Sequence, residues 1–325
     1  MKSSDFQAIL GRLSCLTRNQ IKQAQKTLSA EAAGRDAHAA FADCQPTHCK
    51  LCGDSKIVRN GIQRGQQRWL CRACGKSCCA TTGTPLNRLH GKALFGAHSQ
   101  ALADGLTLRD VRDKLKISLS RALKWRHRFL ELPQTHQAGP IQGILEVDEI
   151  YFKINHKGQR KMPAPRRRGG LMPGQGRLAS NFVPVLVGRA RGGEQVVDKA
   201  LPDMSKTSIA KALSGSVSKD GTVLCMDSHK SFLEIGKILG VEANIFVEGK
   251  RGVGRRKPDG FHVQNVNNYH QRLRDWIDIR LRGVASKNLD LYLAWMRMKW
   301  WWRKEPMPAR DVLASALGWQ IVNSN

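Results

Sequence analysis

The hydrophobic and polar positions change their period partway along the chain. Up to about residue 132 apolar side chains recur mainly at helical spacing, whereas from Gly143 onward short apolar runs and period-two alternation predict strands. The predicted strands are Ile144–Phe152, Asn181–Arg189, Gln195–Leu201, Thr222–Met226 and Asn244–Val247, and the predicted helices are Ser205–Ser214, Ser228–Leu239, Val263–Arg282 and Lys287–Lys304. Because three strands precede an alternation of helix and strand, we expect a mixed α/β sheet flanked by helices and not a β-sandwich.

Breaks in this pattern divide the chain into six predicted segments. Pro133 to Pro140 is rich in Pro, Gly and Gln, which predicts a linker. The segments are an amphipathic helical segment (1–43), a Cys- and Gly-rich module with short strands (44–84), a helical segment (85–132), the linker (133–142), the α/β domain (143–304) and a C-terminal segment (305–325).

The helical segment carries a helix-turn-helix pattern between Leu106 and Leu130. Thr107 with Asp110 suits a capping box at the start of its first helix. After a break at Lys116–Ser118, the second helix has an apolar stripe of Leu119, Leu123 (or Ala122), Trp125 and Phe129. Its other faces carry side chains suited to phosphates and base edges in a major groove, namely Arg121, Lys124 and Arg128. A plain helical hairpin with a basic surface is the alternative.

Composition adds a large positive charge to this picture. The 325 residues include 54 Lys and Arg against 26 Asp and Glu, a formal net charge of +28. Because such an excess repels itself in a compact fold, it predicts an anionic partner, DNA or RNA. Ribosomal association and a basic tail are the alternatives. No apolar run approaches the ~18 residues of a membrane span, and we find no signal-peptide pattern, so we expect a cytoplasmic protein with no membrane partner.

The cysteines form a metal-site pattern. Eight of the nine precede residue 80, which argues against a disulfide framework along the chain. Two Cys-x-x-Cys motifs, each followed by a glycine, are separated by 18 residues. Their spacing lets all four sulfurs reach one tetrahedral Zn²⁺, and each glycine permits the positive φ of the turn. The predicted ligands of this structural zinc are Cys49, Cys52, Cys71 and Cys74, with a redox pair as the alternative. The remaining cysteines of this region, Cys15, Cys44, Cys78 and Cys79, are interpreted as bystanders.

Two aspartates stand out in the second half of this basic chain. Asp148 lies in the middle of a predicted strand, where alternation puts Glu146, Asp148 and Ile150 on one face. Asp227 lies at the end of another apolar strand. Carboxylates on neighbouring strands can share divalent cations that activate one oxygen and stabilise another in phosphoryl transfer. Either aspartate alone is more simply a strand-end cap or an ion-pair partner, but the two together favour catalysis.

The order of these parts resembles bacterial insertion-sequence transposases of the zinc-ribbon DDE type. The shared features are the ribbon, Thr-Thr-Gly-Thr84, the helix-turn-helix, Val-Asp-Glu-Ile-Tyr, Met-Asp-Ser-His-Lys and a helix rich in His and Asn, over roughly residues 45–300. The resemblance implies an RNase H-like fold, two catalytic Mg²⁺ ions, and cleavage and joining of double-stranded DNA at element ends and target. Paired ends imply a homodimer or a larger assembly.

The third catalytic residue of that family departs from its usual type. The family carries a His-Thr-Asn-Thr-Ile-Glu-like motif, and the matching segment His262-Val-Gln-Asn-Val-Asn267 puts Asn267 at the glutamate position. An asparagine carbonyl can ligate Mg²⁺ but brings no charge, so the affinity for metal should be lower. Asn268 is the alternative if the alignment shifts by one residue. Arg274, seven residues after Asn267, would face the same side of the helix and hold phosphate.

Two basic loops and a tryptophan run complete the candidate interface. Between Tyr151 and Ser180 there are eight Lys and Arg and no acid, and a second basic loop precedes Asn267. We expect both loops to grip DNA, with simple solvated loops as the alternative. The loop residues predicted to bind DNA are Arg166, Arg167, Arg168, Lys250, Arg251, Arg255 and Arg256. The tryptophans Trp295, Trp300, Trp301 and Trp302 are expected to pack a terminal helix on the sheet rather than to stack on bases.

The sequence therefore predicts a DDE-type transposase with Asp148, Asp227 and Asn267 as its metal ligands. A non-catalytic DNA-binding regulator derived from a transposase is the alternative, which Asn267 favours and the two aspartates disfavour. A stand-alone nuclease of the same fold is a third possibility.

Overall fold

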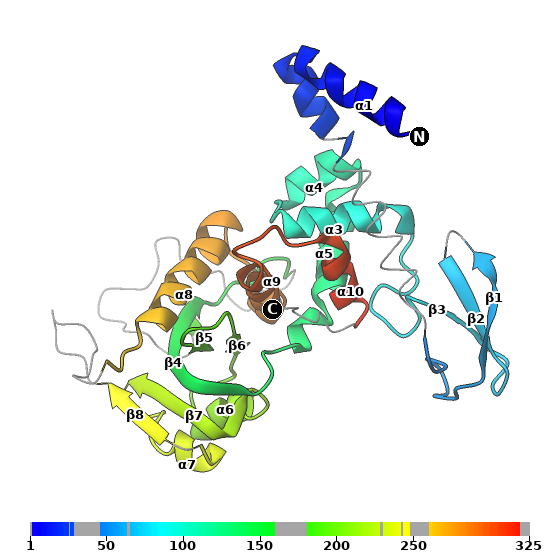
Figure 1. Cartoon of the computed structure of the whole chain (residues 1–325). Coiled ribbons are helices and arrows are strands. Elements are labelled where there is room, and N and C mark those ends of the chain that lie inside the picture. The colour runs from blue at the N-terminus through cyan, green and yellow to red at the C-terminus, as the bar shows by residue number, and fades with distance from the viewer. Residues whose placement is uncertain are drawn as a thin grey trace. The chain divides into compact units, whose positions relative to one another are not determined.

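The computed structural model describes residues 2–25, 27–28, 46–63, 66–159, 181–227, 230–241, 243–247 and 260–318. The chain divides into two compact units: Met1–Phe129 together with Met307–Asn325, and Leu130–Pro306 (Figure 1). The second unit is continuous in sequence, whereas the first contains both ends of the chain. None of the helices in the described part of the chain has both the length and the apolarity that crossing a membrane requires.

Short helices make up most of the first unit. The predicted capping box starts α4: the Thr107 hydroxyl accepts from the Asp110 backbone N–H at 3.3 Å, and the Asp110 carboxylate accepts from the Thr107 N–H at 3.0 Å. Lys116, with a φ of 56°, ends that helix. The helices are α1 (Ser3–Arg12), η1 (Leu13–Cys15), η2 (Lys92–Leu94), α3 (Phe95–Ala103), α4 (Leu108–Leu115), α5 (Leu119–Leu130) and α10 (Ala309–Ala316).

An aromatic cluster forms the core between α3 and α5. The Phe95 ring meets the rings of Trp125 and Phe129 edge-on, both at 5.2 Å between centroids. His98, also from α3, lies against the same two rings and is fully buried. The late helix α10 packs against α3 and contributes Val312 and other apolar residues to this unit.

The buried stripe of α5 differs from the predicted one at its first position. Ala122 is fully buried, whereas Leu119 and Leu123 are 40% and 38% exposed. The stripe therefore runs through Ala122, Trp125 and Phe129: the alternative Ala122 is confirmed over Leu123, and the prediction of Leu119 as a core residue was wrong. Both choices give helical spacing, so packing against α3 decides between them.

The cysteine ribbon, residues 46–63 and 66–84, is built on a small antiparallel sheet. Its strands lie in the order β1 (Ile57–Gln63), β2 (Gln66–Cys71) and β3 (Ser77–Cys79). Trp69, on the central strand, is buried and pairs with Arg59 and Cys78 on the two sides. A domain with so small a hydrophobic core usually needs a disulfide, a bound metal or a partner chain to be stable.

A five-stranded mixed sheet organises the second unit. Its order is β6-β5-β4-β7-β8, with β4 antiparallel to β5 and parallel to β7. The two parallel pairings follow the crossovers through α6 and α7, as parallel neighbours require. The strands are β4 (Ile141–Lys153), β5 (Phe182–Ala190), β6 (Val196–Ala200), β7 (Val217–Asp227) and β8 (Ala243–Val247).

Helices cover both faces of this sheet (Figure 1). On one face, Leu145 and Val147 of β4 share an apolar core with Leu213 of α6 and Ile235 of α7. On the other face, α8 packs against β4 and β5, and α9 packs against β6. The predicted mixed α/β architecture is therefore confirmed. The helices of this unit are η3 (Pro133–Thr135), α6 (Lys206–Leu213), α7 (Ile235–Leu239), α8 (Gln264–Arg274), η5 (Asp275–Arg280), η6 (Ser286–Asn288) and α9 (Leu289–Trp301).

Two predicted helices are shorter than expected. The helix expected over Ser228–Leu239 begins only at Ile235, because Glu234 takes a φ of 70°, which is incompatible with a right-handed helix. The helix expected over Val263–Arg282 is regular only to Arg274 and continues as the π-helical turn η5.

A buried ion pair fastens α9 to the sheet. Arg297 donates to the Asp198 carboxylate on β6 and to the backbone carbonyls of Pro133 and His136. Asp198 also accepts from the Tyr269 hydroxyl at 2.7 Å. Burial lowers the pKa of Arg297 to about 9, so its charge persists at neutral pH and needs the carboxylate.

The tryptophan run of α9 packs as predicted at its first two positions. Trp295 is fully buried and meets Trp276 edge-on at 4.8 Å, and Trp300 is 6% exposed and meets Tyr269 at 5.1 Å. Trp301 and Trp302 are only half-buried.

Candidate active site and cysteine cluster

Asp148 and Asp227 lie on adjacent parallel strands in the sheet. The last paired residues of β4 and β7 are Val147 and Met226, and the next residue of each strand is an aspartate. Residues in register on neighbouring strands point to the same face, and such strands lie about 4.8 Å apart. The two carboxylates therefore start from neighbouring backbone positions. Asp148 is 6% exposed and Asp227 is half-buried.

The face that carries the two aspartates is the one that α8 covers. Glu146 and Cys225, which are paired in the register, lie two residues before Asp148 and Asp227. Both contact the start of α8 or the residues just before it: Glu146 accepts from Asn265 in the first turn, and the Cys225 thiol donates to the His262 carbonyl at 3.3 Å. Because alternate residues share a face, Asp148 and Asp227 face the same side as these two residues.

Glu146 has an environment that the sequence did not predict. It is fully buried, and its carboxylate accepts from the Arg191 Nε at 3.0 Å, from the Asn265 backbone N–H at 2.8 Å and from the Asn265 side-chain amide at 2.7 Å. The Val266 N–H also donates to it at 3.3 Å, and the His262 Nδ1, which accepts from the Gln264 backbone N–H, lies 3.3 Å from the carboxylate. Alternation identifies the face of Glu146, but nothing local in the sequence identifies these partners.

The two candidate asparagines lie in the first turns of α8, and both are exposed. The Asn267 backbone N–H donates to the Val263 carbonyl at 3.2 Å. The Asn268 side-chain oxygen instead accepts from the Arg272 Nε at 3.0 Å. Arg274 is the last residue of α8, two turns after Asn267, and is exposed.

The oxygen donors on this face suit a hard divalent cation. Carboxylate and amide oxygens are the ligand types that Mg²⁺ takes from proteins. Among the described residues, Asp148 and Asp227 are not joined by a third His, Cys, Asp or Glu in a compact cluster.

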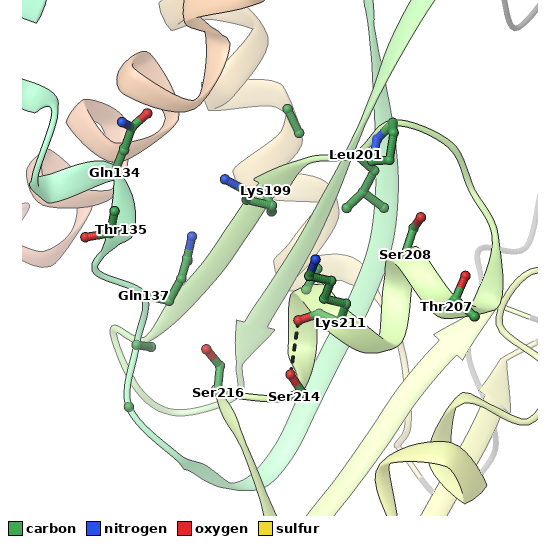
Figure 2. A pocket seen from close by; sticks show the side chains of 16 residues that line it. Gln134, Thr135, Gln137, Lys199, Leu201, Thr207, Ser208, Lys211, Ser214 and Ser216 are labelled. Atoms are coloured by element: carbon green, nitrogen blue, oxygen red, sulfur yellow. Dashed lines mark hydrogen bonds between the residues drawn. The ribbon is translucent and has the colours of Figure 1, made fainter.

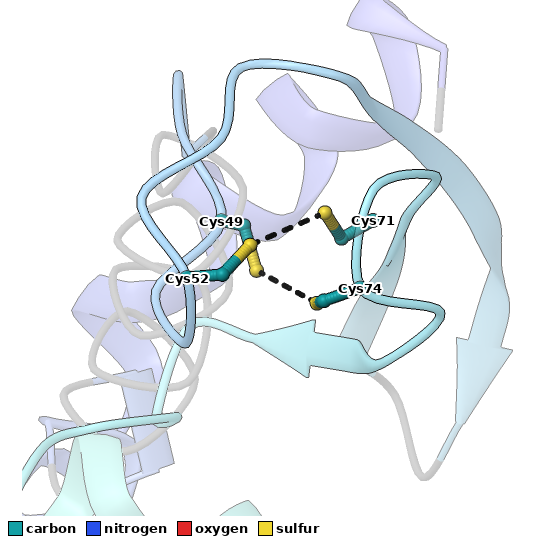
Figure 3. Close-up of side chains that lie close together, drawn as sticks. All are labelled: Cys49, Cys52, Cys71 and Cys74. Atoms are coloured by element: carbon teal, nitrogen blue, oxygen red, sulfur yellow. Dashed lines mark hydrogen bonds between the residues drawn. The ribbon is translucent and has the colours of Figure 1, made fainter.

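The four predicted zinc ligands come together in the ribbon. The ligand atoms of Cys49, Cys52, Cys71 and Cys74 all lie within 4.8 Å of one another (Figure 3). The Sγ atoms of Cys49 and Cys74 are 3.8 Å apart, and those of Cys52 and Cys71 are 3.6 Å apart. This is the only such cluster of three or more candidate ligands in the described part of the chain.

The two cysteine motifs form matching tight turns. The Gly53 N–H donates to the Cys49 carbonyl at 2.8 Å, and the Gly75 N–H donates to the Cys71 carbonyl at 2.9 Å. Both glycines have positive φ, 80° and 66°, as predicted. The Leu51 backbone N–H donates to the Cys49 sulfur at 3.5 Å and lowers the pKa of that thiol.

The other predicted DNA contacts are only partly within the described residues. Arg121, Lys124 and Arg128 are all exposed on α5. The loop residues Arg166, Arg167, Arg168, Lys250, Arg251, Arg255 and Arg256, and the bystander Cys44, lie outside the described residues.

A cavity of about 760 Å³ lies in the second unit (Figure 2). Residues of the 134–139 segment, the end of β6 and α6 line it, including Gln137, Lys199, Lys211 and Ser216. None of the predicted catalytic residues lines this cavity.

The sheet with its paired aspartates and the cysteine cluster define a mixed α/β protein with two candidate metal sites, and comparison with known proteins shows which proteins it resembles. Residues 140–300 match the model of the ISXO2-like transposase domain. The chain is 25% identical over 253 residues to an uncharacterized protein in transposable element ISH50 of Halobacterium salinarum, covering 76% of this chain and 82% of that protein. The resemblance to insertion-sequence transposases is confirmed.

Among solved structures, the chain is similar to the catalytic core domain of BIV integrase. The identity is 13% and the TM-score is 0.30, with 49% of this chain and 84% of that chain covered.

Proposed function

We propose that this protein is a DNA transposase that cleaves DNA at the ends of an insertion sequence and joins those ends to target DNA. The observation that carries the proposal is a pair of aspartates on adjacent strands, Asp148 and Asp227, inside the region that matches the transposase-domain model. A transposase domain acts on DNA, and a net charge of +28 suits that substrate. An RNase H-like fold for residues 143–304 is part of the proposal.

Asp148, Asp227 and Asn267 are the proposed ligands of two Mg²⁺ ions. Their oxygens fit such an ion in chemical type, and bound Mg²⁺ would activate an attacking oxygen and stabilise a leaving one. Asn267 contributes no charge, so we expect weaker metal binding than a glutamate would give. Asn268 is the less suitable candidate, because its side-chain oxygen already accepts from Arg272.

The proposed reaction has two steps. In the first, water attacks the phosphodiester at the element end, the P–O3′ bond breaks to leave a 5′-phosphate on the flanking DNA, and the departing 3′-oxygen takes up a proton as a hydroxyl. In the second, this 3′-hydroxyl loses its proton and attacks a target phosphodiester, which forms a new phosphodiester and displaces the target 3′-oxygen, which is protonated in turn. Neither step requires a covalent protein–DNA bond. Each step needs the reacting phosphate beside the aspartates. We propose that Arg274 and the two basic loops bind the DNA backbone there.

The first unit is the proposed DNA-recognition part. Its α4–α5 pair would act as a helix-turn-helix, with the exposed Arg121, Lys124 and Arg128 contacting DNA. The four clustered cysteines would hold one structural Zn²⁺, because four thiolates at this spacing form a closed tetrahedral site. Because an insertion sequence has two ends, we expect at least two copies of the chain in the active assembly.

The test is strand transfer by the purified full chain with Mg²⁺ and the DNA that flanks its own gene. Asp148→Ala and Asp227→Ala are expected to abolish transfer while DNA affinity is kept. Asp220→Ala is the matched control, because Asp220 is an exposed aspartate of the same strand β7 and should not matter.

The other outcomes separate the alternative functions. If the wild type and the aspartate variants all bind DNA and none transfers strands, the protein is a DNA-binding regulator. If the wild type cuts DNA without element ends and never joins strands, it is a nuclease.

A further inference from the structure

Glu146 is a fully buried carboxylate outside the proposed set of metal ligands. Four nitrogen donors reach it within 3.3 Å, from Arg191, Asn265 (two donors) and Val266. A carboxylate is costly to bury unless every lone pair finds a donor.

The carboxylate caps the start of α8 from a distant part of the chain. The first N–H groups of a helix have no partner within the helix, and a residue just before it commonly accepts from them. Here Val263, at the N-cap, has no side-chain hydrogen bond, and Glu146 accepts from the backbone N–H groups of Asn265 and Val266 instead. Glu146 and Asn265 are 119 residues apart in sequence.

Further contacts fix the chain just before this helix. Arg191 reaches past Glu146 and donates to the carbonyls of His262, at 2.9 Å, and Gly260, at 3.3 Å. Cys225 of β7 donates to the same His262 carbonyl. The entry to α8 is thus held by β4, by β7 and by the residue that follows β5.

From this geometry we infer that Glu146 is a positioning residue: it fixes the first turn of α8, and with it Asn267, relative to Asp148 two residues along the same strand face. The inference rests on the proposed function, because the position of Asn267 matters only if Asn267 binds metal. Asn267 directly follows Val266, whose N–H Glu146 holds, so a shift of this turn moves Asn267 as well.

The position requires a carboxylate and not merely a polar group of the same size. A glutamine has one acceptor oxygen and an NH₂ group, so its NH₂ group would face N–H groups that need an acceptor. Glu146→Gln therefore keeps the volume and loses both the charge and several hydrogen bonds. Asn265→Ala is the milder change, because it removes one side-chain donor and leaves the backbone N–H that Glu146 also holds.

The experiment uses the full chain with these two variants and with Glu234→Gln as the matched control. Glu234 is an exposed glutamate of the same unit, paired with Lys206. Three quantities are measured: Mn²⁺ binding without DNA by electron paramagnetic resonance, kcat and KM for strand transfer against Mg²⁺ concentration, and hydrogen exchange of the peptide that contains Asn265–Asn268.

For Glu146→Gln we expect Mn²⁺ affinity and kcat to fall by about 10- to 100-fold, as for other residues that orient metal ligands. The KM for DNA should stay unchanged, and the start of α8 should exchange faster. Asn265→Ala should lower the Mn²⁺ affinity and kcat by a smaller factor. This variant keeps the inference testable if Glu146→Gln does not fold. Glu234→Gln should match the wild type in all three measurements.

Two results separate failure of this inference from failure of the proposed function. If Asp148→Ala abolishes strand transfer but Glu146→Gln and Asn265→Ala both keep the wild-type Mn²⁺ affinity and kcat, then Glu146 is only structural and the inference is overturned. If Asp148→Ala retains transfer, the metal-site proposal itself is wrong, and the positioning role of Glu146 is lost with it.

Discussion

Replacing His98 with leucine is expected to stabilise the first unit and to remove a pH dependence from its unfolding. His98 is fully buried and lies edge-on to Trp125 and Phe129, with centroid distances of 5.5 and 4.8 Å. Neither of its ring nitrogens has a hydrogen-bond partner among the described residues. Burial, with a smaller contribution from the charge of Arg126, lowers the pKa of this imidazole from 6.5 to about 3.

The sign of the effect follows from where protons bind. Between pH 3 and pH 6.5 the unfolded imidazole is protonated and the folded one is neutral, so stability is fully present above this window and is lost as the pH falls through it. At about 1.4 kcal/mol per pH unit, lowering the pH from 7.5 to 5 should cost the wild type about 2 kcal/mol through His98 alone. Leucine also removes two unsatisfied buried nitrogens, which should add roughly 1 kcal/mol or more at pH 7.5.

The assay compares unfolding free energies of the wild type and His98→Leu at pH 5 and pH 7.5, with hydrogen exchange of α3 and α5 peptides reporting on the first unit. Phe95→Leu is the control, because it alters the same ring cluster without changing a titratable group and should lower stability equally at both pH values. If His98→Leu loses as much stability as the wild type between the two pH values, then the buried-imidazole argument is refuted.

Three further changes test other parts of the molecule. Asp198→Ala leaves Arg297 charged and buried, so we expect a loss of about 3–5 kcal/mol from the second unit, measured by urea unfolding; a loss below 1 kcal/mol would mean that the pair is hydrated. Cys71→Ser should abolish zinc loading, measured by atomic absorption, and should expose only the ribbon amides to exchange; full zinc content would contradict the four-thiolate site. Thr107→Ala should cost about 1 kcal/mol through loss of the cap on α4, and an unchanged melting temperature would show that Asp110 caps the helix alone.

Local patterns in the sequence predicted most of the second unit. All five predicted strands are present, because apolar runs and alternation are set by residues next to one another. The same argument put Asp148 and Asp227 on strands, and parallel pairing of β4 with β7 makes them neighbours. The four cysteines were predictable for a similar reason, since each Cys-x-x-Cys turn closes within a few residues.

Contacts between distant segments could not be predicted in this way. Glu146 meets Arg191 at a separation of 45 residues and Asn265 at 119 residues, and no spacing rule connects them. The helix expected from Ser228 starts late because of the backbone at Glu234, which composition does not signal. Whether Asn267 rather than Asn268 ligates metal stays a prediction.

The membership of α10 in the first unit has a consequence for biosynthesis. A ribosome finishes Leu130–Pro306 before it makes Ala309–Ala316, which pack against α3. Nascent domains fold as units when their sequence has emerged. The sheet can therefore form while the chain is still tethered, whereas the first unit must wait until Ala309–Ala316 have been made. A stop codon just before Ala309 would thus leave the sheet complete and damage the part that was translated first.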